Sequence, residues 1–241
     1  MHITYISTLS EQRALYEKPR DMESFCWYLE QMLAGTDDVH LPITSVNPMG
    51  HAHFLHAVQA LLAIDAEDVA ERAAHAAAEE LPDIGGPVKV FINLLDDRTS
   101  GWTNRTYTEF INHYGEAART RKNQRRRFAG VWFWTSETCT VEKIHGATRD
   151  SLFRIAHQFT HGVPRTLREM LELDRAAFEF SGMRVAALDV KELEYTRALI
   201  EPYLDAVDQP TCIAILFGDD AARACGYPPL GVSMRTGQRL R

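Results

Sequence analysis

The sequence predicts an α/β fold, a three-layer sheet of about three core strands with helices on both faces and a helical flank at its N-terminal end. Three short apolar runs carry this prediction, and each is typical of a buried strand: residues 88–95, 130–135 and 211–217. Helical stretches separate the runs, and such alternation favours a parallel or mixed sheet. Because no Pro-, Gly- or Ser-rich linker divides the 241 residues, we expect a single domain.

Within this single domain, residues 1–241, three regions are expected. Residues 1–81 form a helical N-terminal subregion, residues 82–225 the sheet-containing core, and residues 226–241 an irregular tail. A composition of 45% hydrophobic residues is too apolar for intrinsic disorder and suffices for a sizeable core. The net charge of −7 argues against binding of nucleic acid over the whole surface.

Cysteine usage and hydropathy predict a cytoplasmic protein that has no membrane partner. The four cysteines contain no Cys-x-x-Cys pair, so a zinc ribbon and a thioredoxin-type motif are excluded, and free thiols in a reducing compartment are expected. The chain has neither a signal-peptide pattern at its start nor an apolar run of about 18 residues, the length that a membrane span needs.

The helices are predicted from their apolar periodicity and from their start and stop signals. Before the first strand we expect four helices, over about residues 10–18, 22–34, 48–62 and 66–80. Farther along, a helix ends at His161 before Gly162, and capping-box spacing marks three helix starts. These starts lie at Thr106–Glu109, Thr166–Glu169 and Asp189–Glu192, and Pro202 should kink or end the last helix.

Acidic residues follow all three predicted strands. They are Asp96 and Asp97, then Glu137, then Asp219 and Asp220. At the carboxyl edge of a parallel sheet these carboxylates would converge, and a divalent ion such as Mg²⁺, Mn²⁺ or Zn²⁺ would relieve their repulsion. The alternative is that these acids only cap helices and form turns.

Histidines near the start of the third helix offer a further ligand. His51 falls on the apolar side of that helix, and the positive helix end would keep its imidazole neutral, as a metal ligand or a general base requires. His53 and His56 project away from that side and, three residues apart, could share a metal. The alternative for His51 is a hydrogen-bonded structural side chain.

A substrate-binding loop is predicted after the first strand. Trp102 offers a stacking surface, and Asn104 with Arg105 offers an amide and a guanidinium at a helix start, which suits a carboxylate or a phosphate. A capped turn with Trp102 packed on the sheet is the alternative. The chain has no Gly-x-Gly-x-x-Gly run, no P-loop and no serine elbow, so no nicotinamide or flavin cofactor is indicated.

A second histidine pair, His157 and His161, has the i, i+4 spacing of a zinc-protease helix. Gln158, however, stands where that motif has its general-base glutamate. Both histidines also lie opposite the apolar face of their helix, so we expect them on a solvated face.

Together these patterns favour a metal-assisted enzyme of hydrolase type that acts on a small anionic molecule. In this hypothesis Asp96, Asp97, Glu137 and His51 hold the metal, with His51 as ligand or general base, while Trp102, Asn104 and Arg105 bind the substrate. One alternative is a non-catalytic module that associates with itself or another protein through the bulky strand that holds Trp132 and Trp134. Another is RNA binding through the basic segment 119–127, although its aromatic residues do not interleave with the charges.

Overall fold

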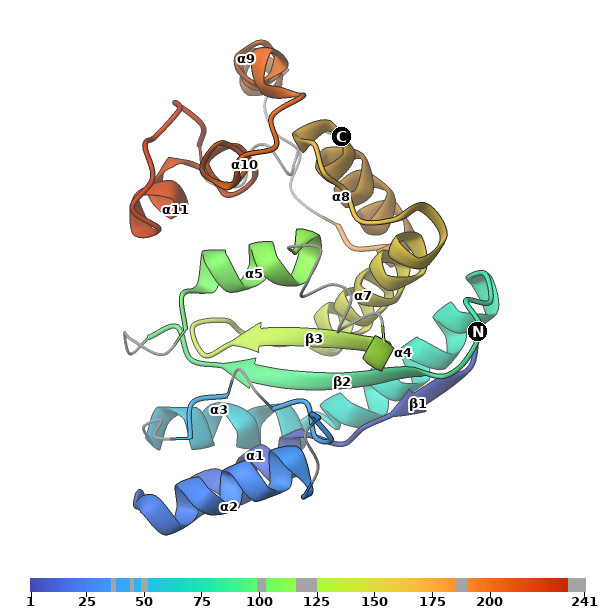
Figure 1. Cartoon of the computed structure of the whole chain (residues 1–241), viewed down its shortest axis with the longest axis vertical. Helices are drawn as coiled ribbons and strands as arrows, with labels where there is room; N and C mark the ends of the chain where they lie inside the picture. Colours follow the sequence, from blue (N-terminus) through green and yellow to red (C-terminus); the bar gives the residue numbers. More distant parts are fainter. Residues whose placement is uncertain are drawn as a thin grey trace. The chain divides into compact units, whose positions relative to one another are not determined.

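The structure, a computed structural model, describes residues 1–35, 38–43, 46–48, 52–98, 103–115, 125–184 and 190–233 (Figure 1). It divides into two compact units that are each discontinuous in sequence. The first unit comprises Met1–Thr103 and Arg126–Ile155, and the second comprises Asn104–Arg125 and Ala156–Arg241. The predicted helical flank and the sheet therefore belong to the same unit.

The first unit contains a three-stranded parallel sheet, one of the two arrangements, parallel or mixed, that the α/β prediction allows. Its order is β1 (Ile3–Tyr5), β2 (Val88–Leu95) and β3 (Phe128–Trp134). The strand β1 pairs with the first residues of β2, with Ile3 opposite Val88. The strand β3 pairs with β2 along its length, with Phe128 opposite Lys89 at one end and Trp134 opposite Leu95 at the other. Two of the three predicted strands are confirmed, and β3 begins two residues earlier than expected.

The predicted strand at 211–217 is wrong, because this run is the helix α10 (Gln209–Phe217) of the second unit. The Asp208 side chain accepts a hydrogen bond from the Thr211 amide at 3.0 Å, and Pro210 occupies the first turn, which is a helix start signal. Every residue from Cys212 to Phe217 is buried, so α10 is apolar all round and resembles a buried strand in sequence. The third strand is instead β1, which is too short for an apolar pattern to reveal.

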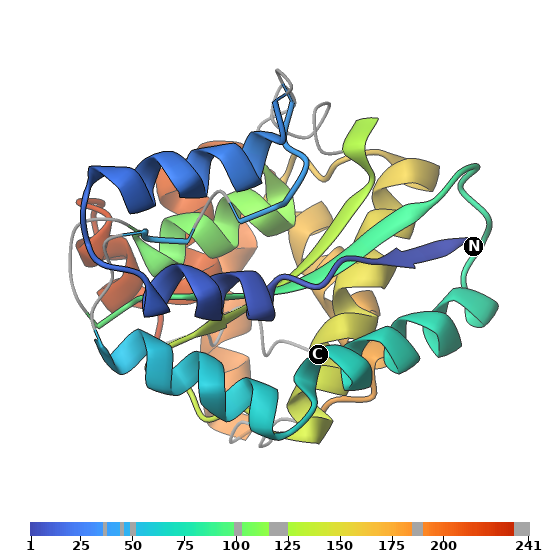
Figure 2. The ribbon, with the colours of Figure 1, turned by 90° about the horizontal axis from the view of Figure 1, so that it is seen from below.

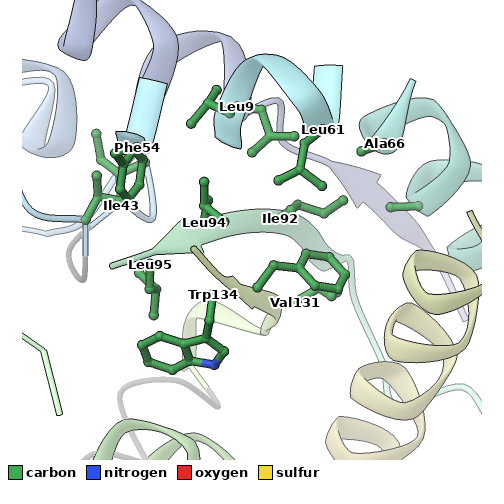
Figure 3. Close-up of a cluster of buried hydrophobic side chains, with 14 of the residues drawn as sticks. Leu9, Ile43, Phe54, Leu61, Ala66, Ile92, Leu94, Leu95, Val131 and Trp134 are labelled. Atoms are coloured by element: carbon green, nitrogen blue, oxygen red, sulfur yellow. The ribbon is translucent and has the colours of Figure 1, made fainter. Parts of the chain in front are cut away.

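Helices flank both faces of the sheet, as predicted (Figure 2). The first unit contains α1 (Leu9–Glu17), α2 (Met22–Leu33), α3 (Ala52–Ala63), α4 (Ala66–Glu80) and α7 (Val141–His161) as far as Ile155. Figure 3 shows Leu9, Leu61, Ala66, Ile92 and Leu94 on one face of the sheet, and Leu95 and Trp134 on the other. From α7, Ser151 Oγ donates a hydrogen bond to the Gly130 carbonyl of β3 at 2.8 Å.

Side chains from α1 continue the pairing of β2 where β1 ends. Thr8 Oγ1 donates to the Ile92 carbonyl, and Gln12 Oε1 accepts from the Leu94 amide at 3.2 Å. Gln12 Nε2 also donates to Asn93 Oδ1 at 2.8 Å, and the Asn93 amide donates to the Pro42 carbonyl at 2.6 Å. Thr8, Gln12 and Asn93 are at most 1% exposed, so these bonds replace water for the backbone groups along this edge of β2.

Glu67 of α4 supplies the cap for the start of α1. Its carboxylate accepts hydrogen bonds from the amides of Thr8 and Leu9, at 2.7 and 3.0 Å, and from Ser7 Oγ at 2.7 Å. Thr8 cannot cap α1 itself, because its hydroxyl is bonded to β2. The carboxylate also lies at the positive end of the helix dipole, which favours its charge.

Replacement of Glu67 by Ala is therefore expected to lower the free energy of unfolding by about 1–2 kcal/mol. Urea denaturation followed by circular dichroism measures this change. Glu71→Ala, at an exposed position one turn farther along α4, is the control and should change stability by less than about 0.5 kcal/mol. Equal stability of the two variants would contradict the tertiary cap.

The second unit is helical in its described residues. Besides α10 and the end of α7, it contains α5 (Arg105–Tyr114), α8 (Leu167–Ser181), α9 (Val190–Ile200), the 3₁₀ turn η1 (Glu201–Tyr203) and α11 (Asp219–Ala224). Its core gathers around α10 and includes Phe110, Leu167 and Met170. None of the described helices is long and apolar enough to cross a membrane.

Most of the predicted helix signals in this unit are confirmed. Thr166 and Glu169 form a capping box, in which the backbone amides of Arg165 and Thr166 lower the pKa of Glu169 below its ordinary value. The helix α9 ends at Ile200, before Pro202, as expected. The predicted box at Thr106 is wrong, because Asn104, two residues earlier, caps α5. Asp189 lies outside the described residues.

Candidate functional site

The carboxyl ends of β2 and β3 bring polar side chains together in the first unit. Asp96 and Asp97 follow β2 directly, and Thr135 and Ser136 follow β3. Because the two strands are parallel and paired to their last residues, both ends lie at the same edge of the sheet (Figure 1). Open parallel sheets bind their ligands at this edge.

Asp96 is the buried centre of this group. Its Oδ1 atom accepts hydrogen bonds from His53 Nε2 and Thr135 Oγ1, each at 2.9 Å, and from the Arg98 amide at 3.0 Å. Three donors thus converge on one oxygen of a carboxylate whose side chain is only 1% exposed. When the imidazole is neutral, Nε2 then carries the ring proton and Nδ1 has the lone pair of a base.

His53 joins the buried acid to solvent. It lies in the first turn of α3, and 27% of its side chain is exposed. The helical periodicity of the sequence predicts that His53 projects away from the apolar face of its helix. It therefore does not predict the contact with Asp96. The signal that could have found it is the position of His53 in the first turn of α3, directly before the buried Phe54, at the end of the helix that meets the strand ends. His51 lies outside the described residues, so its role stays a prediction.

Asp97 is held by the residues that end β3. Its carboxylate accepts from the Ser136 amide at 2.9 Å and from Ser136 Oγ at 2.5 Å, and its Oδ1 atom lies 3.2 Å from Thr135 Oγ1. The Thr135 hydroxyl thus lies within hydrogen-bond distance of Asp96 and Asp97, and 5% of this residue is exposed. The ends of the two strands are consequently linked through the buried Thr135 hydroxyl and through Ser136.

Glu137 forms an ion pair with Lys143, with 2.8 Å between Oε2 and Nζ. Across the described ranges of the chain, no three or more His, Cys, Asp or Glu side chains gather as metal ligands. The predicted metal set of Asp96, Asp97, Glu137 and His51 remains a prediction, because His51 is not among the described residues.

Tyr16 of α1 borders the site on the side of α3. Its ring lies 4.2 Å from the Phe54 ring, between centroids, and its hydroxyl donates to the Asn47 carbonyl. Burial and the negative charge of Asp96 raise the pKa of Tyr16 well above its ordinary value, so the hydroxyl keeps its proton at neutral pH. Tyr16 therefore ties the segment before α3 to the helix that carries His53.

The residues predicted to bind substrate have structural contacts within the second unit. Asn104 Oδ1 accepts from the Tyr107 amide at 2.9 Å, as the cap of α5, and Arg105 Nε lies 2.9 Å from Glu109 Oε1. These contacts agree with the alternative of a capped turn, whereas Trp102 lies outside the described residues. They leave the predicted binding roles of Asn104 and Arg105 untested.

The third pair of acids does not follow a strand, because α10 is a helix. Asp219 instead accepts hydrogen bonds from the amides of Leu230, Gly231 and Val232, and Asp220 pairs with Arg223 at 2.8 Å. These bonds attach the segment after α11 to its start.

Two arginines of the basic segment have contacts within the first unit. Arg126 pairs with Asp38, and Arg127 Nη1 donates to the Ile84 carbonyl at 2.8 Å. Residues 119–124 lie outside the described residues. The two described contacts favour a structural role for this end of the segment.

No protein-family model, curated protein or solved structure matches this chain. The chemistry of the site therefore has to be inferred from its own side chains.

Proposed function

We propose that the protein is an enzyme in which His53, oriented by Asp96, acts as general base and then general acid at the carboxyl edge of the sheet. The observation that carries this proposal is the 2.9 Å contact between a partly exposed imidazole and a carboxylate whose side chain is 1% exposed. The buried carboxylate selects the ring tautomer and stabilises the imidazolium that forms when His53 accepts a proton.

Hydrolysis of an ester or phosphoester of a small anionic molecule is the reaction that we assign to this pair. His53 would take a proton from water as it attacks and return a proton to the leaving group. The exposed Arg98, directly after the acids in sequence, supports an anionic substrate. The free state of all four cysteines supports a cytoplasmic location.

The metal-assisted form of this hydrolase differs only in how water is activated. In that form Asp96, Asp97, Glu137 and His51 would hold a divalent ion, which would supply a Lewis acid for the activation of water. His53 would then act as a positioning residue through Asp96. The two forms make opposite predictions for chelators.

The proposal is tested with p-nitrophenyl acetate, p-nitrophenyl phosphate and bis(p-nitrophenyl) phosphate as substrates. On the substrate that is hydrolysed, His53→Gln and Asp96→Asn should each reduce kcat/KM by about 10²–10⁴-fold, because each removes proton transfer by an oriented imidazole. The matched control is His56→Gln, at an exposed position of the same helix, which should retain wild-type kcat/KM.

Two further measurements complete this test. Urea denaturation verifies that the Asp96→Asn variant is folded, and assays after EDTA treatment with Mn²⁺ or Zn²⁺ restored distinguish the two forms. Loss with EDTA and recovery with metal favour the metal-assisted form, whereas unchanged activity favours His53 as the base. Hydrolysis that is equally fast in wild type and His53→Gln, or absent with all three substrates, would refute the assignment.

A further inference from the structure

A second group of histidines lies at the end of α7, in residues of the second unit. His157 and His161 stack with ring centroids 4.6 Å apart and planes 23° apart. His161 is exposed and His157 is partly exposed, so the pair is accessible from solvent, as the sequence predicts. Two imidazoles at i, i+4 are thus already aligned on one face of the helix.

The surroundings of the two rings distinguish their nitrogen atoms. Thr160 Oγ1 lies 2.9 Å from the Ala156 carbonyl, 3.2 Å from the His157 carbonyl and 2.7 Å from His161 Nδ1. Because the hydroxyl proton goes to a carbonyl, the hydroxyl oxygen accepts the Nδ1 proton of His161, and the lone pair resides on Nε2. The Nδ1 atom of His157 is closed off from solvent, and the residue as a whole is partly exposed.

The position in the helix adds an electrostatic preference. His161 is the last residue of a 21-residue helix, where the unpaired carbonyl groups form the negative end of the helix dipole. A positive charge is favoured there, within the last turn. A bound cation would therefore be stabilised by the helix as well as by the imidazoles.

We infer that His157 and His161 chelate one divalent transition-metal ion through their Nε2 atoms, with water in the remaining positions. Imidazole ligands suit Zn²⁺, Ni²⁺ and Cu²⁺, and the order of affinity should place Cu²⁺ above the other two. In the stacked arrangement the two ring planes are nearly parallel, so binding of one ion by both Nε2 atoms requires rotation of at least one ring. Because Gln158 replaces the general-base glutamate of zinc proteases, the site binds metal without activating water by that route.

Isothermal titration of the whole protein with Zn²⁺ at pH 7.5 tests this inference. His157→Gln and His161→Gln should each weaken one Zn²⁺ site by about tenfold or more, and the double variant should be no weaker than either single variant, as a chelate requires. The control is His145→Gln, an exposed histidine about three to four turns earlier on the same helix, which should bind as the wild type does.

Thr160 provides a second readout that a surface histidine alone would not show. Thr160→Val removes the acceptor of the His161 proton and should weaken Zn²⁺ binding by about tenfold, whereas Thr160→Ser should restore it. Circular dichroism verifies that the variants are folded. Unchanged Zn²⁺ affinity in both histidine variants, or independent and additive losses from the two, would overturn the inference.

Discussion

The substitution Gln12→Met is expected to lower the free energy of unfolding by about 2–5 kcal/mol, although methionine has nearly the same size and shape as glutamine. Gln12 is 0% exposed and serves two groups of β2 at once. Without its amide, the backbone N–H of Leu94 and the Oδ1 atom of Asn93 are left buried without these partners. Each unsatisfied group costs about 1–3 kcal/mol.

Urea denaturation followed by fluorescence and by circular dichroism measures the effect of Gln12→Met. Gln59→Met is the matched control, because Gln59 is exposed on α3 of the same unit, and its change should stay within about 0.5 kcal/mol. If the two variants unfold at the same urea concentration, the edge of β2 does not depend on the Gln12 amide.

The substitution Trp134→Ala should have a comparable or larger effect, lowering the free energy of unfolding by about 3–5 kcal/mol. Among the described side chains with less than 2% exposure, Trp134 is the largest by residue volume. It packs against the sheet on the same face as Leu95. Its removal leaves a cavity that the parallel strands cannot collapse to fill.

Trp132 offers an internal comparison for this prediction. It points to the same face as Trp134, two residues earlier in β3, but it is only partly buried. Trp132→Ala should therefore cost clearly less, about 1–3 kcal/mol. Thermal unfolding of both variants measures the difference, and a greater loss for Trp132→Ala would contradict the assigned burial.

Local signals in the sequence are sufficient to predict those elements that turn-forming or capping residues bound at both ends. The strand at 88–95 and the helix at 66–80 are confirmed at both ends, because glycines, prolines and acids bound their apolar patterns. The run at 211–217 was misassigned because a helix buried on all sides and a buried strand are both continuously apolar. In that case Asp208 and Pro210 were the better guides to structure.

The candidate site was predictable only in part, for a geometric reason. The prediction that Asp96 lies at the carboxyl edge of the sheet follows from strand direction alone, and Asp97 accompanies it. The partner of Asp96 depends on how α3 crosses that edge, and helical periodicity cannot determine this crossing. For that reason the sequence pattern favours His51 as the partner, whereas the structure brings His53 to the acid.

The sequence by itself predicted an α/β protein with a parallel or mixed sheet and with acids after its strands, because strand patterns and caps are local. That the sheet is parallel, and that only two of the three acid-bearing runs are strands, is shown by the structure. Only the tertiary structure decided which residues, distant in sequence, supply the hydrogen bonds that these helices and strands need. Glu67 caps α1 across 58 residues, and Gln12 pairs with β2 across about 80 residues. Hydrogen-bond requirements of buried groups must be met, but the residues that meet them can come from anywhere in the chain, and packing alone selects them.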